Sequence, residues 1–348
     1  MPLQTPAVTQ NKALSLLSLD AGGARGISQL KMLSELMHRL NFGIESEDKS
    51  HPCDVFDVVG GIGTGGFIAI LLVIVGLSVE QALEEFIELS VTILENQELN
   101  PQTRTAATKE YITNMLTKHN MQGEEHLRDL NERSKRCKLI VPISNKADVK
   151  SNVNLTNFDS NKEKGLNFTV FEALVTTLLM PPLFDSIKVT RDASVLEYVS
   201  GDLALCDPAQ EIMVVACDAV GPERLLGCLL SLGCGRRGVT KLPSSSDVTH
   251  LTNLMGKLVM DGEQIVQTME GRMGQLGIYQ RFDVAKGLEH LGPDSTLDLG
   301  EMITHTDVYL TDISVSRRID LCVDLLKNRE GIASLEQLSR FRHGRRIR

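Results

Sequence analysis

Two glycine-rich turns contain the residues whose types and spacing could perform chemistry. The first, Asp-Ala-Gly-Gly-Ala-Arg-Gly at residues 20–26, lies between a short apolar run and an amphipathic segment, the pattern of a strand that leads into a helix. Free backbone N–H groups and the positive helix end favour an anion there, either a phosphate group or the oxyanion formed when a nucleophile attacks a carbonyl. The candidate binding residues are Gly22, Gly23, Ala24, Arg25 and Gly26. The turn has neither the Gly-Lys-Ser/Thr of a P-loop nor the full dinucleotide fingerprint.

The second turn, Gly-Gly-Ile-Gly-Thr-Gly-Gly at residues 60–66, occupies the place of a nucleophile elbow of the form G-x-S-x-G. Gly63 stands at the serine position of that pattern. Glycine supplies no oxygen that could attack a carbonyl. Thr64 carries the nearest hydroxyl, but it lies one residue past the apex, so we expect its side chain to point elsewhere.

Short apolar runs and amphipathic segments predict the elements that position these turns. We expect buried strands at 13–19, 55–59, 139–143, 212–216 and 229–232, and helices at 27–40 and 67–75. Residues 146–165 are rich in Asn, Asp, Ser and Lys and predict an exposed loop, whereas residues 239–330 read mainly as helices with a turn near 292–295. Alternating strands and helices predict an α/β fold with a mostly parallel central sheet between helical layers.

The order and spacing of several motifs resemble the patatin-like phospholipase family, most closely its stand-alone fungal members. The family shows D-G-G-G-x-R-G followed by G-T-S-T-G-G, which the two turns match in order. The segments 168–184 (FTVFEALVTTLLMPPLF) and 229–235 (LLSLGCG) are similar to further family motifs. The resemblance implies a three-layer α/β/α domain over residues 13–330, with a core at 14–240 and a helical C-terminal part at 241–330, between a polar segment at 1–12 and a basic tail at 331–348.

The resemblance also implies a Ser–Asp dyad that hydrolyses acyl esters, and both positions are substituted here. The elbow serine corresponds to Gly63. The family's aspartate lies in D-G-G/A-x-x-x-N-N-P, which aligns with residues 200–208 and places Ser200 at the aspartate position. Asp202 and Asp207 stand near that position, and either could supply a carboxylate to a remodelled pocket or be a loop residue without chemistry.

Two residues of the first turn allow more than one role. Asp20 would cap the following helix or hold the turn in shape. Arg25 would bind a ligand phosphate or carboxylate, or tie loops together.

Composition excludes several classes of function. The 348 residues contain 36 Lys+Arg against 45 Asp+Glu, a net charge of −9, which argues against a nucleic-acid partner. Seven cysteines and eight histidines show no metal-site spacing, and no cofactor motif is present. A polar start without an apolar signal core and an odd cysteine count predict a cytoplasmic protein with reduced thiols. The basic segment Arg340–Arg348 could make a weak contact with an anionic membrane, or be a solvated end.

These observations lead to three hypotheses for the function. The first is a patatin-fold pseudoenzyme that binds a lipid, an acyl group or a partner. The second is a repurposed enzyme that performs a cyclisation, isomerisation or transfer on an apolar metabolite in the former acyl pocket. The third is a residual lipid acyl hydrolase. The oligomeric state is left open.

Overall fold

The structure is a computed structural model that describes residues 12–45, 48–131, 136–159, 166–191, 194–235, 262–284 and 298–339. The strands are β1 (Leu14–Leu19), β2 (Val58–Gly61), β3 (Lys138–Asn145), β4 (Asp148–Thr156), β5 (Ile187–Arg191), β6 (Ser194–Ser200), β7 (Leu225–Leu232), β8 (Tyr279–Phe282) and β9 (Ala333–Ser334). The α-helices are α1 (Gly26–Leu40), α2 (Pro52–Val55), α3 (Thr64–Ile70), α4 (Val79–Leu89), α5 (Pro101–Lys118), α6 (Val170–Leu178), α7 (Ala209–Val220), α9 (Glu263–Met273), α10 (Leu299–Thr311), α11 (Ile313–Asn328) and α12 (Leu335–Ser339). Short 3-10 turns η1 (Gly23–Arg25), η5 (Gly201–Leu203) and η6 (Gly274–Leu276), and π turns η3 (Leu71–Val75) and η4 (Ser90–Leu94), adjoin them.

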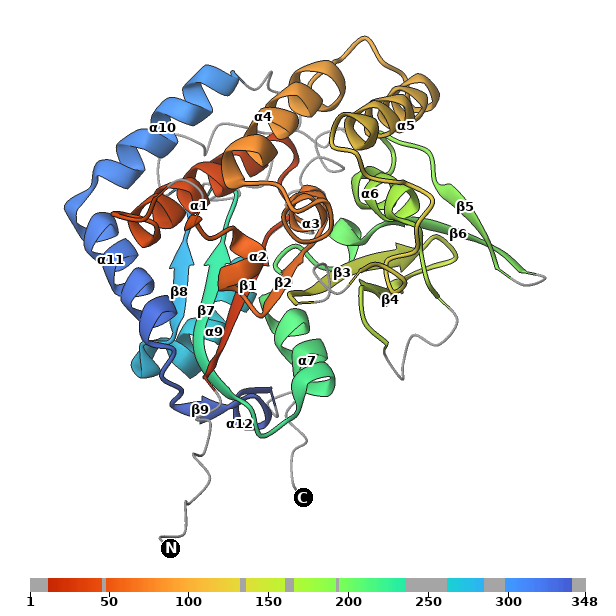
Figure 1. Ribbon diagram of the computed structural model, residues 1–348. Helices are drawn as coiled ribbons and strands as arrows, with labels where there is room; N and C mark the ends of the chain where they lie inside the picture. The colour runs from red at the N-terminus through yellow and green to blue at the C-terminus, as the bar shows by residue number, and fades with distance from the viewer. Residues whose placement is uncertain are drawn as a thin grey trace, which may run out of the picture.

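One mixed sheet forms the centre of the molecule (Figure 1). Its strand order is β5-β6-β3-β2-β1-β7-β8, with β4 on β3 and β9 on β7. The pairs among β3, β2, β1, β7 and β8 along this path are parallel, whereas β4, β5, β6 and β9 pair antiparallel. The carboxyl ends of β1 and β2 therefore meet at one edge of the sheet, where both glycine turns begin.

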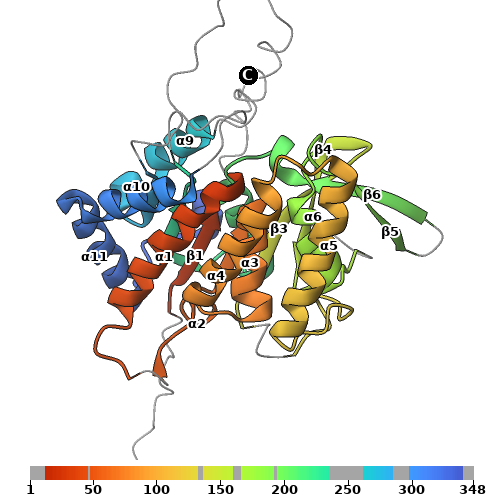
Figure 2. The same cartoon turned by 90° about the horizontal axis from the view of Figure 1, so that it is seen from above.

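Helices cover both faces of the sheet. Successive side chains of a strand point to opposite faces, so a strand that is apolar along its whole length needs a helical layer on each side. Leu17 and Leu19 of β1 pack into a large core with α1, α3, α4, α5, α6, α10 and α11. Leu14 and Leu16 pack into a second core with α7, α9 and α12 on the other face. Figures 1 and 2 show the two helical layers on either side of the strands. The predicted α/β fold with a mostly parallel sheet and helices on both faces is confirmed.

Two predictions of local structure were wrong, and the strand predicted at 55–59 lies later, at Val58–Gly61, because Val55 ends the short helix α2. The apolar run at 212–216 lies in the middle of helix α7 and is not a strand, because a short apolar run fits a buried helix as well as a buried strand. The helix starts where the Asp207 carboxylate accepts the N–H of Ala209 at 2.8 Å. The predicted loop at 146–165 contains β4, whose pairing with β3 outweighs its polar composition.

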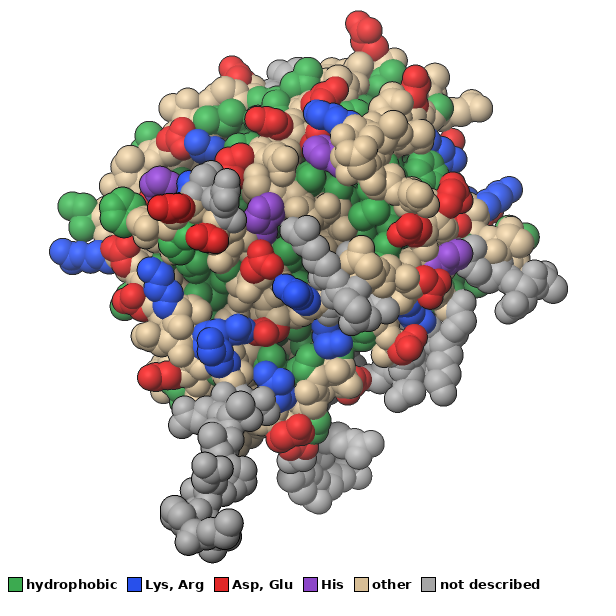
Figure 3. Space-filling view, in the orientation of Figure 1, with side chains coloured by type: hydrophobic (Ala, Val, Ile, Leu, Met, Phe, Trp, Pro, Cys, Tyr) green, Lys and Arg blue, Asp and Glu red, His purple; other side chains and the backbone are tan. Residues whose placement is uncertain are grey.

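The part of the chain after residue 239 is mainly helical where it is described, as predicted, but it also adds β8 to the sheet edge. The predicted turn near 292–295 and the basic segment Arg340–Arg348 lie outside the described residues. None of the helices described combines the length and the apolar character that a membrane crossing requires. On the face drawn in Figure 3, acidic and basic side chains are interspersed.

Candidate functional site at the glycine turns

The second glycine turn makes a sharp change from strand to helix. β2 ends at Gly61, and α3 begins at Thr64. Gly63 between them has φ 57° and ψ −130°, a conformation that strongly favours glycine. This is the local geometry of a nucleophile elbow, held here without a nucleophilic side chain.

The space that a side chain at Gly63 would enter is filled by Asp202. A Cβ built on Gly63 would lie 2.5 Å from Asp202 Oδ1 and 2.7 Å from Asp202 Cγ, closer than real Cβ atoms approach their neighbours. Asp202 comes from η5, directly after β6, and is buried. The structure thus brings together Gly63, which follows β2, and Asp202, which follows β6, from the two strands that pair with β3 along the sheet.

Ser200 holds the Asp202 carboxylate in this position. Its hydroxyl donates a hydrogen bond to Asp202 Oδ1, and both residues are buried. Burial raises the pKa of Asp202 to about 6, although the Ser200 hydrogen bond opposes this shift. A buried carboxyl group that changes protonation near neutral pH is thus placed at the apex of the elbow.

Thr64 also lies beside the apex, at the first position of α3. It is buried, and its hydroxyl oxygen has no hydrogen-bond partner among the residues described.

The first glycine turn packs closely against the strand end of β7. A Cβ on Gly22 would overlap the side chain of Cys234, so only glycine permits this approach. Arg25 is buried, and its Nε donates a hydrogen bond to Gly22 O at 3.3 Å. Its Nη1 is buried without a hydrogen-bond partner among the described residues. The guanidinium group therefore keeps hydrogen-bonding capacity that an anion could use.

Asp20 holds the first turn in shape and does not cap a helix. Its carboxylate accepts two hydrogen bonds from Arg281, from Nη1 at 3.0 Å and from Nη2 at 2.6 Å. Arg281 is on β8 and also donates to Ser231 Oγ of β7 at 2.8 Å. Asp207 Oδ2 lies 3.8 Å from Nη1, and Asp283 Oδ2 lies 3.2 Å from Nη2. Three carboxylates thus surround one guanidinium group.

One guanidinium group does not neutralise three carboxylates, so the cluster retains protons at neutral pH. Burial raises the pKa of Asp20 to about 8; the Arg281 charge opposes this effect and Asp207 adds to it. Burial likewise raises the pKa of Asp207. Arg281 stays charged, because its carboxylate neighbours hold its pKa well above the usual value against the opposing effect of burial.

Two other candidate chemistries find little support. Burial raises the pKa of the Cys206 thiol to about 11, which leaves it mostly protonated and weakly nucleophilic. No group of three His, Cys, Asp or Glu side chains within the described ranges is arranged to hold a metal ion.

Sequence reasoning did not find Arg281, which the structure places at the centre of the buried cluster. In the segment Tyr-Gln-Arg-Phe-Asp at 279–283, Asp283 directly follows β8 and lies two residues after Arg281, the spacing that places side chains on the same side of an extended chain. That alternation was the available signal, but alternate polar residues also occur on exposed strand faces. The candidates Asp20 and Asp207 were found, and it is Arg281 that joins them.

Comparison with known proteins identifies the family. A search of curated proteins finds no match. Among solved structures, the chain is similar to VipD from Legionella pneumophila, with 13% sequence identity and a TM-score of 0.45, over 91% of this chain and 67% of that one. The patatin-like phospholipase family model matches residues 17–209, more than half of the 348 residues, and includes both glycine turns. The chain belongs to the patatin-like phospholipase family, as its ordered motifs predicted.

Proposed function

We propose that this protein is a patatin-fold binding protein that does not hydrolyse esters through an acyl-enzyme intermediate. The observation that carries the proposal is the buried Asp202 carboxylate in the space where a side chain at position 63 would begin. An acyl ester has no hydroxyl to react with at the apex of this elbow, and the carboxylate stands in its path. Loss of the nucleophile alone lowers turnover by about 10⁶ in a well-studied serine hydrolase.

The first glycine turn is the part of the site that can still bind. Its backbone and the buried Arg25 Nη1 without a partner among the described residues suit an oxyanion or a carboxylate. We propose that the ligand is an apolar or acyl-bearing molecule whose polar end occupies this turn. A protein partner that inserts an acidic side chain would use the same chemistry.

The direct test measures esterase activity and covalent labelling of the wild-type protein. We expect no turnover of a chromogenic short-chain ester above a heat-inactivated control, and no labelling by a fluorophosphonate probe. Labelling of any side chain, located by peptide mass spectrometry, would contradict the proposal.

A reconstruction tests whether the space filled by Asp202 is the reason for the lost activity. The triple variant G63S/S200D/D202G restores a hydroxyl and a carboxylate at the family positions and removes the side chain that fills the elbow. We expect weak ester turnover and probe labelling that are absent from the matched control G63A/S200D/D202G. A triple variant that unfolds cooperatively, as wild type does, and stays inert would show that further parts of the site have changed.

Binding is tested by mass spectrometry of the organic extract of purified protein. We expect an apolar or acyl-bearing molecule to be retained by wild type and depleted in Arg25→Gln. Equal retention by the two proteins would place the ligand away from the first turn. An extract that contains no such molecule, together with no binding of added fatty acids, would contradict binding.

A second candidate function rests on the protonation of Asp202. A buried carboxyl group with a pKa of about 6 at the elbow is suited to move a proton in an isomerisation or cyclisation that needs no acyl intermediate. This function predicts that a metabolite is converted during incubation, with an inflection near pH 6 in the rate profile. Asp202→Asn should abolish the conversion and leave ligand binding intact.

A further inference from the structure

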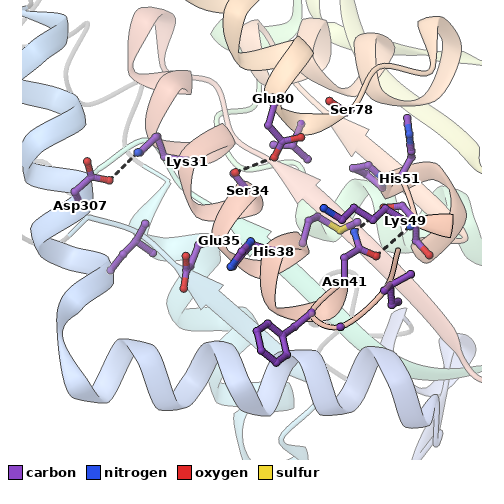
Figure 4. A pocket seen from close by; sticks show the side chains of 18 residues that line it. Lys31, Ser34, Glu35, His38, Asn41, Lys49, His51, Ser78, Glu80 and Asp307 are labelled. Atoms are coloured by element: carbon purple, nitrogen blue, oxygen red, sulfur yellow. Dashed lines mark hydrogen bonds and ion pairs between the residues drawn. The ribbon is translucent and has the colours of Figure 1, made fainter. Parts of the chain in front are cut away.

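A cavity of about 530 Å³ lies along α1, away from the glycine turns. The first turn adjoins the start of α1 at Gly26, whereas the cavity begins at Lys31 and continues past the end of the helix to residues 41–44 and 49–51. The first turn of α4 and the side chain of Asp307 on α10 complete its walls. Figure 4 shows side chains from these elements converging on the cavity.

The cavity is held in shape by hydrogen bonds within its own wall. Asn41 closes the segment that follows α1, because its Nδ2 donates to Ser50 O and its Oδ1 accepts from Ser50 N, both at 3.0 Å. Ser78 caps α4 and accepts the N–H of Gln81 at 3.2 Å. These contacts make the cavity a preformed site of the size that small ligands occupy.

Most carboxylates of the lining already have partners. Lys31 Nζ lies 2.8 Å from Asp307 Oδ1, and Glu35 Oε1 lies 2.7 Å from Arg39 Nη2. Glu80 accepts a hydrogen bond from Ser34 Oγ at 3.1 Å and lies in the first turn of α4, where the helix dipole favours negative charge.

Lys49 and the imidazole groups of the lining are left available to a ligand. Lys49 extends into the cavity and has no ion pair among the residues described. His51 is the N-cap of α2 and its side chain faces the N–H of Asp54, but its buried Nδ1 has no hydrogen-bond partner in the described part of the chain. His38 also lines the cavity. A ligand with an anionic group would provide the partners that Lys49 and His51 lack.

The remaining lining suits the rest of such a ligand. The oxygen atoms of Ser34 and Glu80 keep lone pairs that can accept hydrogen bonds from the hydroxyl groups of a ligand. Phe42 stands at the rim with 81% of its surface exposed, and an aromatic ring in this setting can cover the flat apolar face of a bound ring.

We propose that this cavity binds a small phosphorylated polyol, with the phosphate group at Lys49 and His51, hydroxyl groups at Ser34 and Glu80, and the carbon face against Phe42. Soluble sugar phosphates and phosphoinositol lipid head groups share this chemistry. The site is separate from the elbow, so it binds its ligand whether or not the protein has an acyl ligand or an activity.

Isothermal titration calorimetry with inositol 1-phosphate, glycerol 3-phosphate, inorganic phosphate and unphosphorylated inositol tests the site. We expect the phosphorylated polyols to bind, and inositol to bind at least tenfold more weakly. Lys49→Gln should weaken the binding of inositol 1-phosphate at least tenfold and Phe42→Ala severalfold. The control Lys109→Gln, which removes an exposed charge from α5, should bind as wild type does.

Sedimentation with phosphatidylcholine vesicles, with and without phosphatidylinositol 4-phosphate, distinguishes the two sources of the head group. Binding of the free phosphates alone assigns a soluble metabolite. Vesicle binding that depends on both the phosphoinositide and Lys49 assigns a lipid head group. The proposal fails if neither probe binds, or if Lys49→Gln and Lys109→Gln bind equally.

Discussion

The Asp202 carboxylate fills the space that a side chain at Gly63 would enter. The two residues come from different elements. Gly63 belongs to the turn after β2, and Asp202 to the turn after β6. Neither residue explains the site alone, because the carboxylate fits only when no Cβ is present. The close fit at this turn therefore depends on both residues.

This pairing predicts the stability of variants at position 63. Gly63→Ala should destabilise the fold by more than the ~1–3 kcal/mol of a strained backbone, because the new Cβ must also displace the Asp202 carboxylate. In the Asp202→Gly background the same substitution should be less destabilising. Urea unfolding of wild type, Gly63→Ala, Asp202→Gly and the double variant measures how much the destabilisation by Gly63→Ala depends on Asp202.

Gly43→Ala is the matched control for this cycle. Gly43 has φ 80°, and no atom lies within 4 Å of a Cβ built there, so only the backbone part of the effect remains. If Gly63→Ala destabilises the protein equally with and without the Asp202 carboxylate, the two residues do not interact as described.

Arg281 is the second residue with a predicted large effect. Arg281→Met should destabilise the fold by about 3–5 kcal/mol, because it leaves buried carboxylates without their cation. Arg39→Met removes ion pairs nearer the surface and should change stability by less than about 1 kcal/mol. Equal effects of the two substitutions in chemical unfolding would argue against a central role for the buried cluster.

At the scale of elements, one buried arginine joins η4 to the start of α5. Arg104 Nη1 donates to the carbonyls of Ile93 at 2.6 Å and Leu94 at 3.0 Å, and Nη2 donates to those of Asn96 at 2.7 Å and Leu99 at 3.1 Å. These carbonyls lie in the last turn of η4 and just after it, where backbone acceptors have no helical partners.

Removal of the Arg104 side chain should destabilise the segment 93–99, whose carbonyl groups it binds. Arg104→Met should destabilise the protein by about 2–4 kcal/mol, and Arg104→Lys should recover only part, because an ammonium group lacks the planar fork that reaches four carbonyls. Hydrogen exchange of residues 93–99 would report the change locally. A lysine variant as protected as wild type would show that the guanidinium geometry is unimportant.

The sequence predicts elements well where pattern and context agree, as in β1, α1 and β7. It fails at α7, because five consecutive apolar residues have no period that separates a helix from a strand. The residues proposed from the sequence, which include both glycine turns, Asp202 and Asp207, lie together in the structure, but their role stays a prediction. The contact between Asp202 and Gly63 and the ion pair between Asp20 and Arg281 join distant segments, and no local pattern encodes them.

At the scale of the whole molecule, the buried carboxyl groups determine how stability depends on pH. The folded pKa is about 8 for Asp20 and about 6 for Asp202, against an ordinary value of 3.8 for both. The folded state therefore binds more protons at these two groups than the unfolded state does in this range, and their contribution to stability should fall as pH rises from about 4 to 8. Each group contributes a slope of at most about 1.4 kcal/mol per pH unit.

Other carboxylates act in the opposite direction at lower pH. Burial alone would raise the pKa of Glu85, but hydrogen bonds from Lys118, His119 and Tyr111 lower it. Their stabilising effect is present above the ordinary pKa of a glutamate and is lost as pH falls below it. We expect maximum stability near pH 5, measured by urea unfolding across pH, and a flatter decline toward pH 7 in Asp202→Asn. A stability that rises steadily to pH 8 would contradict the raised pKa values.

The position of Arg281 also determines where this chain can be shortened. The family-matched stretch ends at residue 209, and the cation that holds the first turn is contributed by β8, more than seventy positions later. A chain cut after its recognisable motifs would keep Asp20 and Asp207 but lose their counterion and the neighbouring strand. We therefore expect a fragment that ends at residue 209 not to fold on its own, and hybrids with other patatin-like proteins should exchange β8 together with the glycine turn.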